Sequence, residues 1–174
     1  MNSKFSNVEL IDNYILLSYN GGLRKYSYDL KLISEIPIEE LELNSYSDIH
    51  QLDENMIIIE SSRAIYLIEN DLIKYKINFD NISFFRQVLI INSNTYLVLK
   101  VELTTSLINF CLYNTESNIP IKIIKSNAYN YYSCSLSSLG NNNYIICFLV
   151  DDTDIYYNIF DSNLNQIVSD TKIN

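Results

Sequence analysis

Apolar residues occur along this chain in short runs, separated by turns rich in Asn, Asp, Ser and Gly. Residues 73–79 (IKYKINF) alternate apolar and polar positions, which is typical of a strand buried on one face. Residues 14–17 (YILL) and 144–150 (YIICFLV) are apolar throughout, which predicts central strands covered on both faces. Most side chains in these runs are β-branched or aromatic, as strands prefer. The pattern predicts an all-β protein.

The strand pattern repeats four times along the chain. Each repeat reads as strand, turn, apolar strand, turn, aromatic strand, Asp- or Asn-containing turn and final strand. The second strands begin at Tyr14, Met56, Tyr96 and Tyr144, at spacings of 42, 40 and 48 residues. A period of this length with four strands per repeat predicts propeller-type blades. We expect one all-β domain over 1–174, with repeat units at about 5–40, 47–80, 84–125 and 131–174.

Several architectures fit four such antiparallel four-stranded blades. They could close into a small propeller, form an arc of a larger one, or pair with a second copy to complete a ring. An open arc would leave an apolar face at each end, so it needs a partner. The alternative is an up-and-down β-barrel with a small-ligand cavity, which fits the length but does not explain the period.

The fourth repeat resembles the blade-type repeats of bacterial and protist surface proteins. The matching positions are Leu139, Gly140, Asn141, Tyr144, Ile146, Ile155, Tyr156, Phe160, Asp161, Ser162, Asn165, Ile167, Ile173 and Asn174. Gly140 precedes Asn141 where the family has Asn before Gly, and Phe148 stands near the place of the usual Trp. The resemblance implies a propeller fold, which many unrelated roles share. No Gly-His or Trp-Asp pair of a WD-repeat occurs.

The charge of the chain limits its partners. The formal net charge is −9 and the isoelectric point is about 4.5. This argues against nucleic acid as the main partner and against adsorption to an anionic membrane. No apolar run is long enough to predict membrane insertion. The abundance of Ile, Asn and Tyr is typical of AT-rich coding.

The cysteines and the N-terminus bear on the compartment. Three cysteines, an odd number, and an N-terminus without a signal-peptide pattern favour the cytoplasm, or a surface location if the chain is part of a longer one. If Gly140-Asn141 centres a hairpin, Cys134 and Cys147 face each other and a disulfide is conceivable. Otherwise they pack as small hydrophobic residues. The single histidine, His50, gives a zinc site no second imidazole.

Two clusters are weak candidates for binding. Asp151, Asp152 and Asp154 share an acidic turn that could hold Ca²⁺, although the spacing and Gly of an EF-hand loop are absent, and a solvated turn is the alternative. Tyr129, Tyr131 and Tyr132 could stack on a sugar or anchor a protein interface. Their alternative role is to fill the space between blades.

No catalytic motif stands out. The chain lacks a nucleophile elbow and a phosphate-binding glycine loop, and no cofactor is indicated. We therefore expect a non-catalytic protein–protein interaction or scaffold module that acts within an assembly or by self-association. A glycan-binding or adhesive module is the alternative, and a hydrolase that uses a pair of carboxylates is the third hypothesis.

Overall fold

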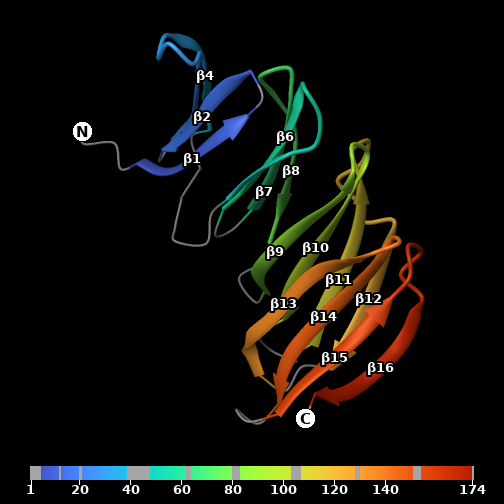
Figure 1. Cartoon of the computed structure of the whole chain (residues 1–174). Coiled ribbons are helices and arrows are strands. Elements are labelled where there is room, and N and C mark those ends of the chain that lie inside the picture. The colour runs from blue at the N-terminus through green and yellow to red at the C-terminus, as the bar shows by residue number, and fades with distance from the viewer. Residues whose placement is uncertain are drawn as a thin grey trace. The chain divides into compact units, whose positions relative to one another are not determined.

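The computed structural model describes residues 5–11, 13–19, 21–38, 48–61, 64–79, 83–102, 107–127, 130–150 and 154–173. Over these residues it contains strands and no helix (Figure 1). The strands form four separate antiparallel sheets of four strands each. This confirms the all-β class and the four four-stranded units. The alternative up-and-down architecture, which needs one closed sheet, is wrong.

Each sheet is a meander in which neighbouring strands follow one another along the chain. Sheet A contains β1 (Phe5–Ile11), β2 (Tyr14–Tyr19), β3 (Gly22–Tyr26) and β4 (Leu32–Pro37). Sheet B contains β5 (Ile49–Gln51), β6 (Met56–Glu60), β7 (Ala64–Glu69) and β8 (Leu72–Asn78). Sheet C contains β9 (Ser83–Asn92), β10 (Thr95–Glu102), β11 (Leu107–Asn114) and β12 (Lys122–Asn127). Sheet D contains β13 (Asn130–Gly140), β14 (Asn143–Val150), β15 (Asp154–Phe160) and β16 (Gln166–Ile173).

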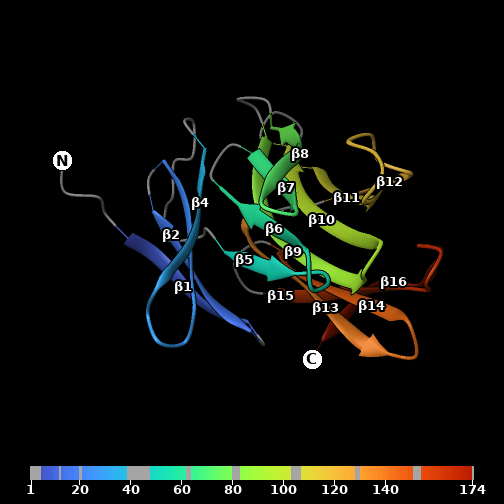
Figure 2. The same cartoon turned by 90° about the horizontal axis from the view of Figure 1, so that it is seen from above.

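The sheets pack in pairs within two compact units, residues 1–78 and 79–174. In the first unit, sheet A faces sheet B (Figures 1 and 2). In the second unit, sheet C faces sheet D. The first strands of paired sheets are neighbours, β1 beside β5 and β9 beside β13. The Leu136 amide of sheet D donates to Gln87 Oε1 of sheet C at 2.9 Å.

Apolar side chains hold each pair together. The core of the first unit comprises Ile11, Tyr14, Leu16, Leu23, Ile36 and Ile38 from the sheet A part and Ile49, Ile57, Ile59, Ala64, Tyr66 and Ile68 from sheet B. In the second unit Phe110 of sheet C packs against Phe160 of sheet D, with ring centroids 5.5 Å apart. In sheet B the strand β6 is buried on both faces, since every one of its residues is buried. The all-apolar run at Met56 is thus a fully covered central strand.

Sheets A and D share an unusual turn between their third and fourth strands. In residues 27–31 the amide of Leu30 donates to the carbonyl of Ser27, and in residues 161–165 the amide of Leu164 donates to that of Asp161. Both leucines have a positive φ, 62° and 58°. Asp161 Oδ1 also accepts from the Asn165 amide at 2.7 Å. Asp161 and Asn165 both belong to the motif that resembles surface-protein repeats. In the structure the Asp161 carboxylate closes this turn by accepting the Asn165 amide, a role that Asp side chains favour in turns.

The hairpin between β13 and β14 corrects one prediction. Its turn residues are Asn141 and Asn142, both with positive φ, rather than Gly140-Asn141. The new turn position, together with a register shift between Ser138 and Gly140, pairs Cys134 with Phe148, and Cys147 with Ser135. The two cysteines therefore lie on opposite faces of sheet D, and neither forms a disulfide. The conceivable cross-strand disulfide is wrong.

Gly22 is where sheet A requires glycine most strictly. Its φ is +155°, and a Cβ there would lie 2.2 Å from the carbonyl oxygen of Ile36 on the paired strand. We expect Gly22→Ala to lower the free energy of unfolding by about 3 kcal/mol, because the backbone of β4 must move. Gly140→Ala is the control, since a Cβ there meets nothing within 4 Å and costs only the positive φ of +82°, about 1–2 kcal/mol. Urea unfolding measures both, and equal losses would contradict the close approach.

Candidate functional site

The outward faces of sheets A and D differ from the sequence-based expectation. Residues 14–17 and 144–150 predict strands covered on both faces. In β2 the exposure instead alternates, with Tyr14 and Leu16 buried and Ile15 and Leu17 only half-buried. β14 alternates in the same way over residues 144–148. The prediction of double coverage is wrong for these two strands, and each leaves an apolar face only partly covered.

The outer face of sheet A combines aliphatic side chains with one internal ion pair. Residues paired across the strands share a face, and this face carries Val8, Leu10, Ile15, Leu17, Tyr19, Arg24, Tyr26 and Glu35. Leu10 is 70% exposed. Arg24 lies 3.3 Å from Glu35 and 4.8 Å above the Tyr19 ring. Because the two charges neutralise each other, the face has no net charge.

The outer face of sheet D carries no formal charge at its paired, described positions. These positions are Ser135, Ser137, Ile145, Cys147, Ile155, Tyr157, Ile159, Val168, Thr171 and Ile173. Ile155 and Ile173, a directly paired couple, are 45% and 47% exposed. In a chain of net charge −9, two neutral, partly apolar sheet faces are the surfaces best suited to contact another protein.

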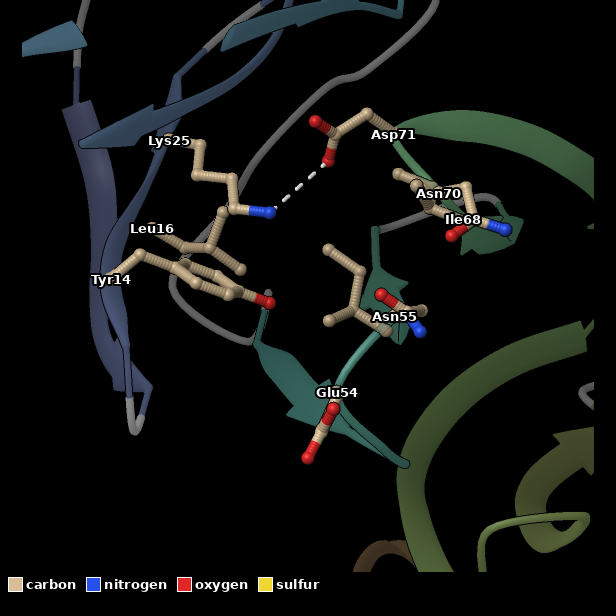
Figure 3. Close-up of a pocket in the computed structure, with 9 residues that line it drawn as sticks. Tyr14, Leu16, Lys25, Glu54, Asn55, Ile68, Asn70 and Asp71 are labelled. Carbon is tan, nitrogen blue, oxygen red and sulfur yellow. Dashed lines mark ion pairs between the residues drawn. The ribbon is translucent and has the colours of Figure 1, made fainter. Parts of the chain in front are cut away.

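A pocket lies between sheets A and B within the first unit (Figure 3). Its volume is about 260 Å³. Its apolar lining comes from both sheets, and its polar lining comes mainly from two turns of sheet B, before β6 and between β7 and β8. The lining residues are Tyr14, Leu16, Lys25, Glu54, Asn55, Ile57, Ile68, Asn70 and Asp71.

Local backbone geometry places the polar groups of this pocket. Asn70 and Asp71 form a two-residue turn with φ of 51° and 62°. The Asn70 amide donates to the Asn55 carbonyl at 2.9 Å, which holds the two turns together. Asp71 then reaches sheet A, where its Oδ2 accepts from the Ser34 hydroxyl at 2.8 Å and its Oδ1 lies 3.7 Å from Lys25 Nζ.

Tyr14 and Lys25 meet in the pocket. The Lys25 ammonium lies 4.0 Å from the centroid of the Tyr14 ring, a cation–π contact. Burial raises the pKa of the Tyr14 phenol, and the negative charges of Asp71 and Asp53 raise that pKa further. The phenol is therefore protonated at neutral pH and sits in a negative potential.

Sheet B also contains a titratable pair on its other face. His50 Nε2 lies 2.5 Å from Glu60 Oε1, and the Glu60 side chain is only 4% exposed. Burial alone would lower the pKa of His50. The hydrogen bond to Glu60 and the charges of Glu60, Asp48 and Glu9 outweigh it, and the pKa of His50 is raised above its ordinary value.

Of the binding candidates chosen from the sequence, Asp154 has a described side chain, and it does not line this pocket. Asp154 opens β15 and pairs with Lys172 at 2.8 Å. Tyr129, Asp151 and Asp152 lie outside the described residues, as do the side chains of Tyr131 and Tyr132 within β13. The structure therefore adds nothing to the calcium or glycan hypotheses, which stay predictions.

The described part of the chain shows neither a metal-binding cluster nor a membrane-spanning helix. No group of three or more His, Cys, Asp or Glu side chains is arranged there to hold a metal ion. That part also contains no helix long and apolar enough to cross a membrane.

Comparisons with known proteins place the fold. The chain is similar to the WD40 β-propeller domain of Doa1, with a TM-score of 0.62, 11% identity, and coverage of 95% of this chain and 52% of that one. The four sheets are β-propeller blades. The fold is shared with a WD40 domain although the Trp-Asp pair is absent here.

Two further structures agree on the propeller fold. BBS1N, solved in complex with ARL6DN, has a TM-score of 0.59 at 13% identity, over 98% of this chain and 54% of that one. Kluyveromyces lactis Hsv2 has a TM-score of 0.54 at 10% identity, over 99% and 49%. The chain thus spans about half the length of the propellers it matches. No protein-family model and no curated protein sequence matches the chain, and the resemblance to surface proteins stays a prediction.

Sequence reasoning missed the pocket. Tyr14, Lys25 and Asp71 come from a second strand, a third strand and a turn of the next blade, so no local spacing joins them. The one available signal was the Asn70-Asp71 turn, because an Asp at a blade turn can contact the neighbouring blade.

The His50–Glu60 pair makes stability depend on pH. A histidine whose folded pKa is raised contributes stability that is present below its unfolded pKa and is lost as the pH rises through the folded pKa. We expect the free energy of unfolding to fall between about pH 6 and pH 8, the range in which histidine titrates. His50→Gln, which removes the chain's only histidine, should flatten this dependence in urea unfolding across that range. A wild-type stability that rises with pH would contradict the assignment.

Proposed function

We propose that this chain is a non-catalytic protein–protein interaction module that works by self-association. The observation that carries the proposal is the pair of partly covered, net-neutral apolar faces on sheets A and D. A propeller blade normally lies between two neighbours, so each face is covered by another blade. Every residue of β6 is buried, whereas on β2 of sheet A and β14 of sheet D buried positions alternate with half-buried ones.

A second copy of the chain supplies the missing neighbours. Two copies can place the outer face of sheet A in one against the outer face of sheet D in the other, twice, around a two-fold axis. The match to about half of each similar propeller supports this, since two copies provide the blades of one such ring.

Charge also favours these faces as the contact. Two chains that each carry −9 repel one another over most of their surface. On the outer face of sheet A, Arg24 and Glu35 neutralise each other, and the paired positions on sheet D are uncharged. Contact there adds apolar burial without bringing unpaired like charges together.

The proposal predicts a concentration-dependent dimer. Light scattering over a dilution series should give a mass of twice 20.3 kDa at high concentration. Leu10→Lys and Ile155→Lys, one on each outer face, should each shift the series towards monomer by about tenfold or more in dissociation constant, because each buries an unpaired charge.

The matched control for Leu10→Lys is Leu72→Lys. Leu72 is 71% exposed against 70% for Leu10, but it lies on sheet B, away from both outer faces. It should leave the dimer unchanged. A monomer at every concentration, or equal effects of the two substitutions, would rule out self-association through these faces.

A further inference from the structure

The Tyr14 hydroxyl opens into the pocket of the first unit and makes no hydrogen bond to another residue in the described part of the chain. Tyr14 is 8% exposed, so more than nine-tenths of it is buried. Figure 3 shows its hydroxyl pointing into the pocket, away from the strand that carries it. Buried polar groups are nearly always hydrogen-bonded. A ligand that enters the pocket can supply this bond.

The pocket favours a positively charged ligand. Its lining contains the carboxylates of Glu54 and Asp71 and one cation, Lys25, so its own groups sum to a net negative charge. The amides of Asn55 and Asn70 add side-chain carbonyl acceptors beside them.

Lys25 demonstrates that a cation fits there. Its ammonium group lies between the Tyr14 ring, at 4.0 Å, and the Asp71 carboxylate, at 3.7 Å. The distance to Asp71 exceeds that of a hydrogen-bonded ion pair, about 2.7–2.9 Å. A donor with better geometry can therefore take up the Asp71 carboxylate more closely than Lys25 does.

We propose that this pocket binds the guanidinium group of an arginine side chain presented by a protein partner. A guanidinium is planar, offers five N–H donors in a fixed fork and stacks on aromatic rings, which suits Tyr14, Asp71 and the two asparagine carbonyls. The aliphatic part of the arginine can lie on Leu16, Ile57 and Ile68. The volume of about 260 Å³ is below the range of about 300–1,000 Å³ for small-molecule sites and suits a single side chain.

The inference does not depend on self-association. The pocket lies between sheets A and B, on the face of sheet A opposite to Leu10 and Ile15. Arginine binding and dimer formation can therefore succeed or fail separately.

The direct test is an NMR titration of the 174-residue chain, labelled with ¹⁵N, against N-acetyl-argininamide. The control ligand is N-acetyl-citrullinamide, which has nearly the same shape and no charge. Saturable shifts of the Tyr14, Asn70 and Asp71 amides are expected with the arginine compound. The citrulline compound should bind about tenfold more weakly or worse, the loss expected when a charge-assisted hydrogen bond becomes a neutral one. Equal shifts with the two ligands, or none that saturate, would overturn the proposal.

Two variants separate ligand binding from a purely structural role. Asp71→Asn should weaken arginine binding by about tenfold. Lys25→Met should instead strengthen it several-fold, because it removes the resident cation that competes for Tyr14 and Asp71. If Lys25→Met weakens binding or leaves it unchanged, the lysine does not compete and the proposal fails.

Lys74→Met is the matched control for Lys25→Met. Its ammonium pairs with Glu69 at 3.3 Å, and its side chain is 23% exposed against 21% for Lys25. It should leave arginine affinity unaltered. Light scattering of the Lys25→Met chain should match wild type, so a loss of self-association cannot be mistaken for a loss of the pocket.

Discussion

Face-to-face packing of one four-stranded meander on the next is the interaction on which this structure depends. A single meander buries little by itself, because both of its faces remain open to water. When sheet A packs on sheet B, side chains such as Leu16, Ile59 and Tyr66 become almost fully buried. Each such side chain contributes about 1.5–3 kcal/mol relative to exposure. The same packing joins sheets C and D through Phe110 and Phe160. The stability of this chain therefore comes from packing between neighbouring blades. A sheet face that no blade covers leaves apolar side chains partly exposed to water.

The proposed function rests on this partial exposure of apolar strands rather than on a sequence motif. The runs that begin at Tyr14 and Tyr144 are apolar at successive positions, as in strands buried on both faces. In the structure one face of each strand is buried and the other is only half-buried. The similar run at Met56 is covered on both. The chemistry of the three runs is alike, so the difference lies in what stands beside them. A partly covered face of this kind cannot be recognised from its residues alone, because in a closed ring the same residues would be ordinary core.

The sequence predicted the strands and their grouping because these depend on local alternation and on a period of 40 to 48 residues. The register of strand pairing was harder to predict from the sequence. Placing the turn at Gly140-Asn141 instead of Asn141-Asn142, without the register shift between Ser138 and Gly140, assigned Cys134 and Cys147 to the same face. Asn-rich hairpins invite this error, since several adjacent residues tolerate a left-handed backbone. Leu30 and Leu164 adopt a positive φ that no propensity would assign to leucine, and hydrogen bonds across the turn account for it. The pocket was beyond reach because its residues meet only when two blades pack.

The two units also show how repeated blades diverge. In both, the outer half of the first sheet contacts the third turn of the second sheet. In the second unit Lys122 donates to the Asn163 carbonyl at 2.7 Å, a close contact with a backbone group. In the first unit the corresponding turn presents Asp71, which Ser34 and Lys25 reach from sheet A while Tyr14 stands beside them. In the second unit the hydrogen bond between Lys122 and a backbone carbonyl closes the junction. In the first unit Asp71 lies 3.7 Å from Lys25, beside the Tyr14 ring, and this looser arrangement leaves a pocket with a negative potential. The side chains at the two turns thus distinguish a closed junction from one that contains a pocket, while apolar faces hold the blades together in both units.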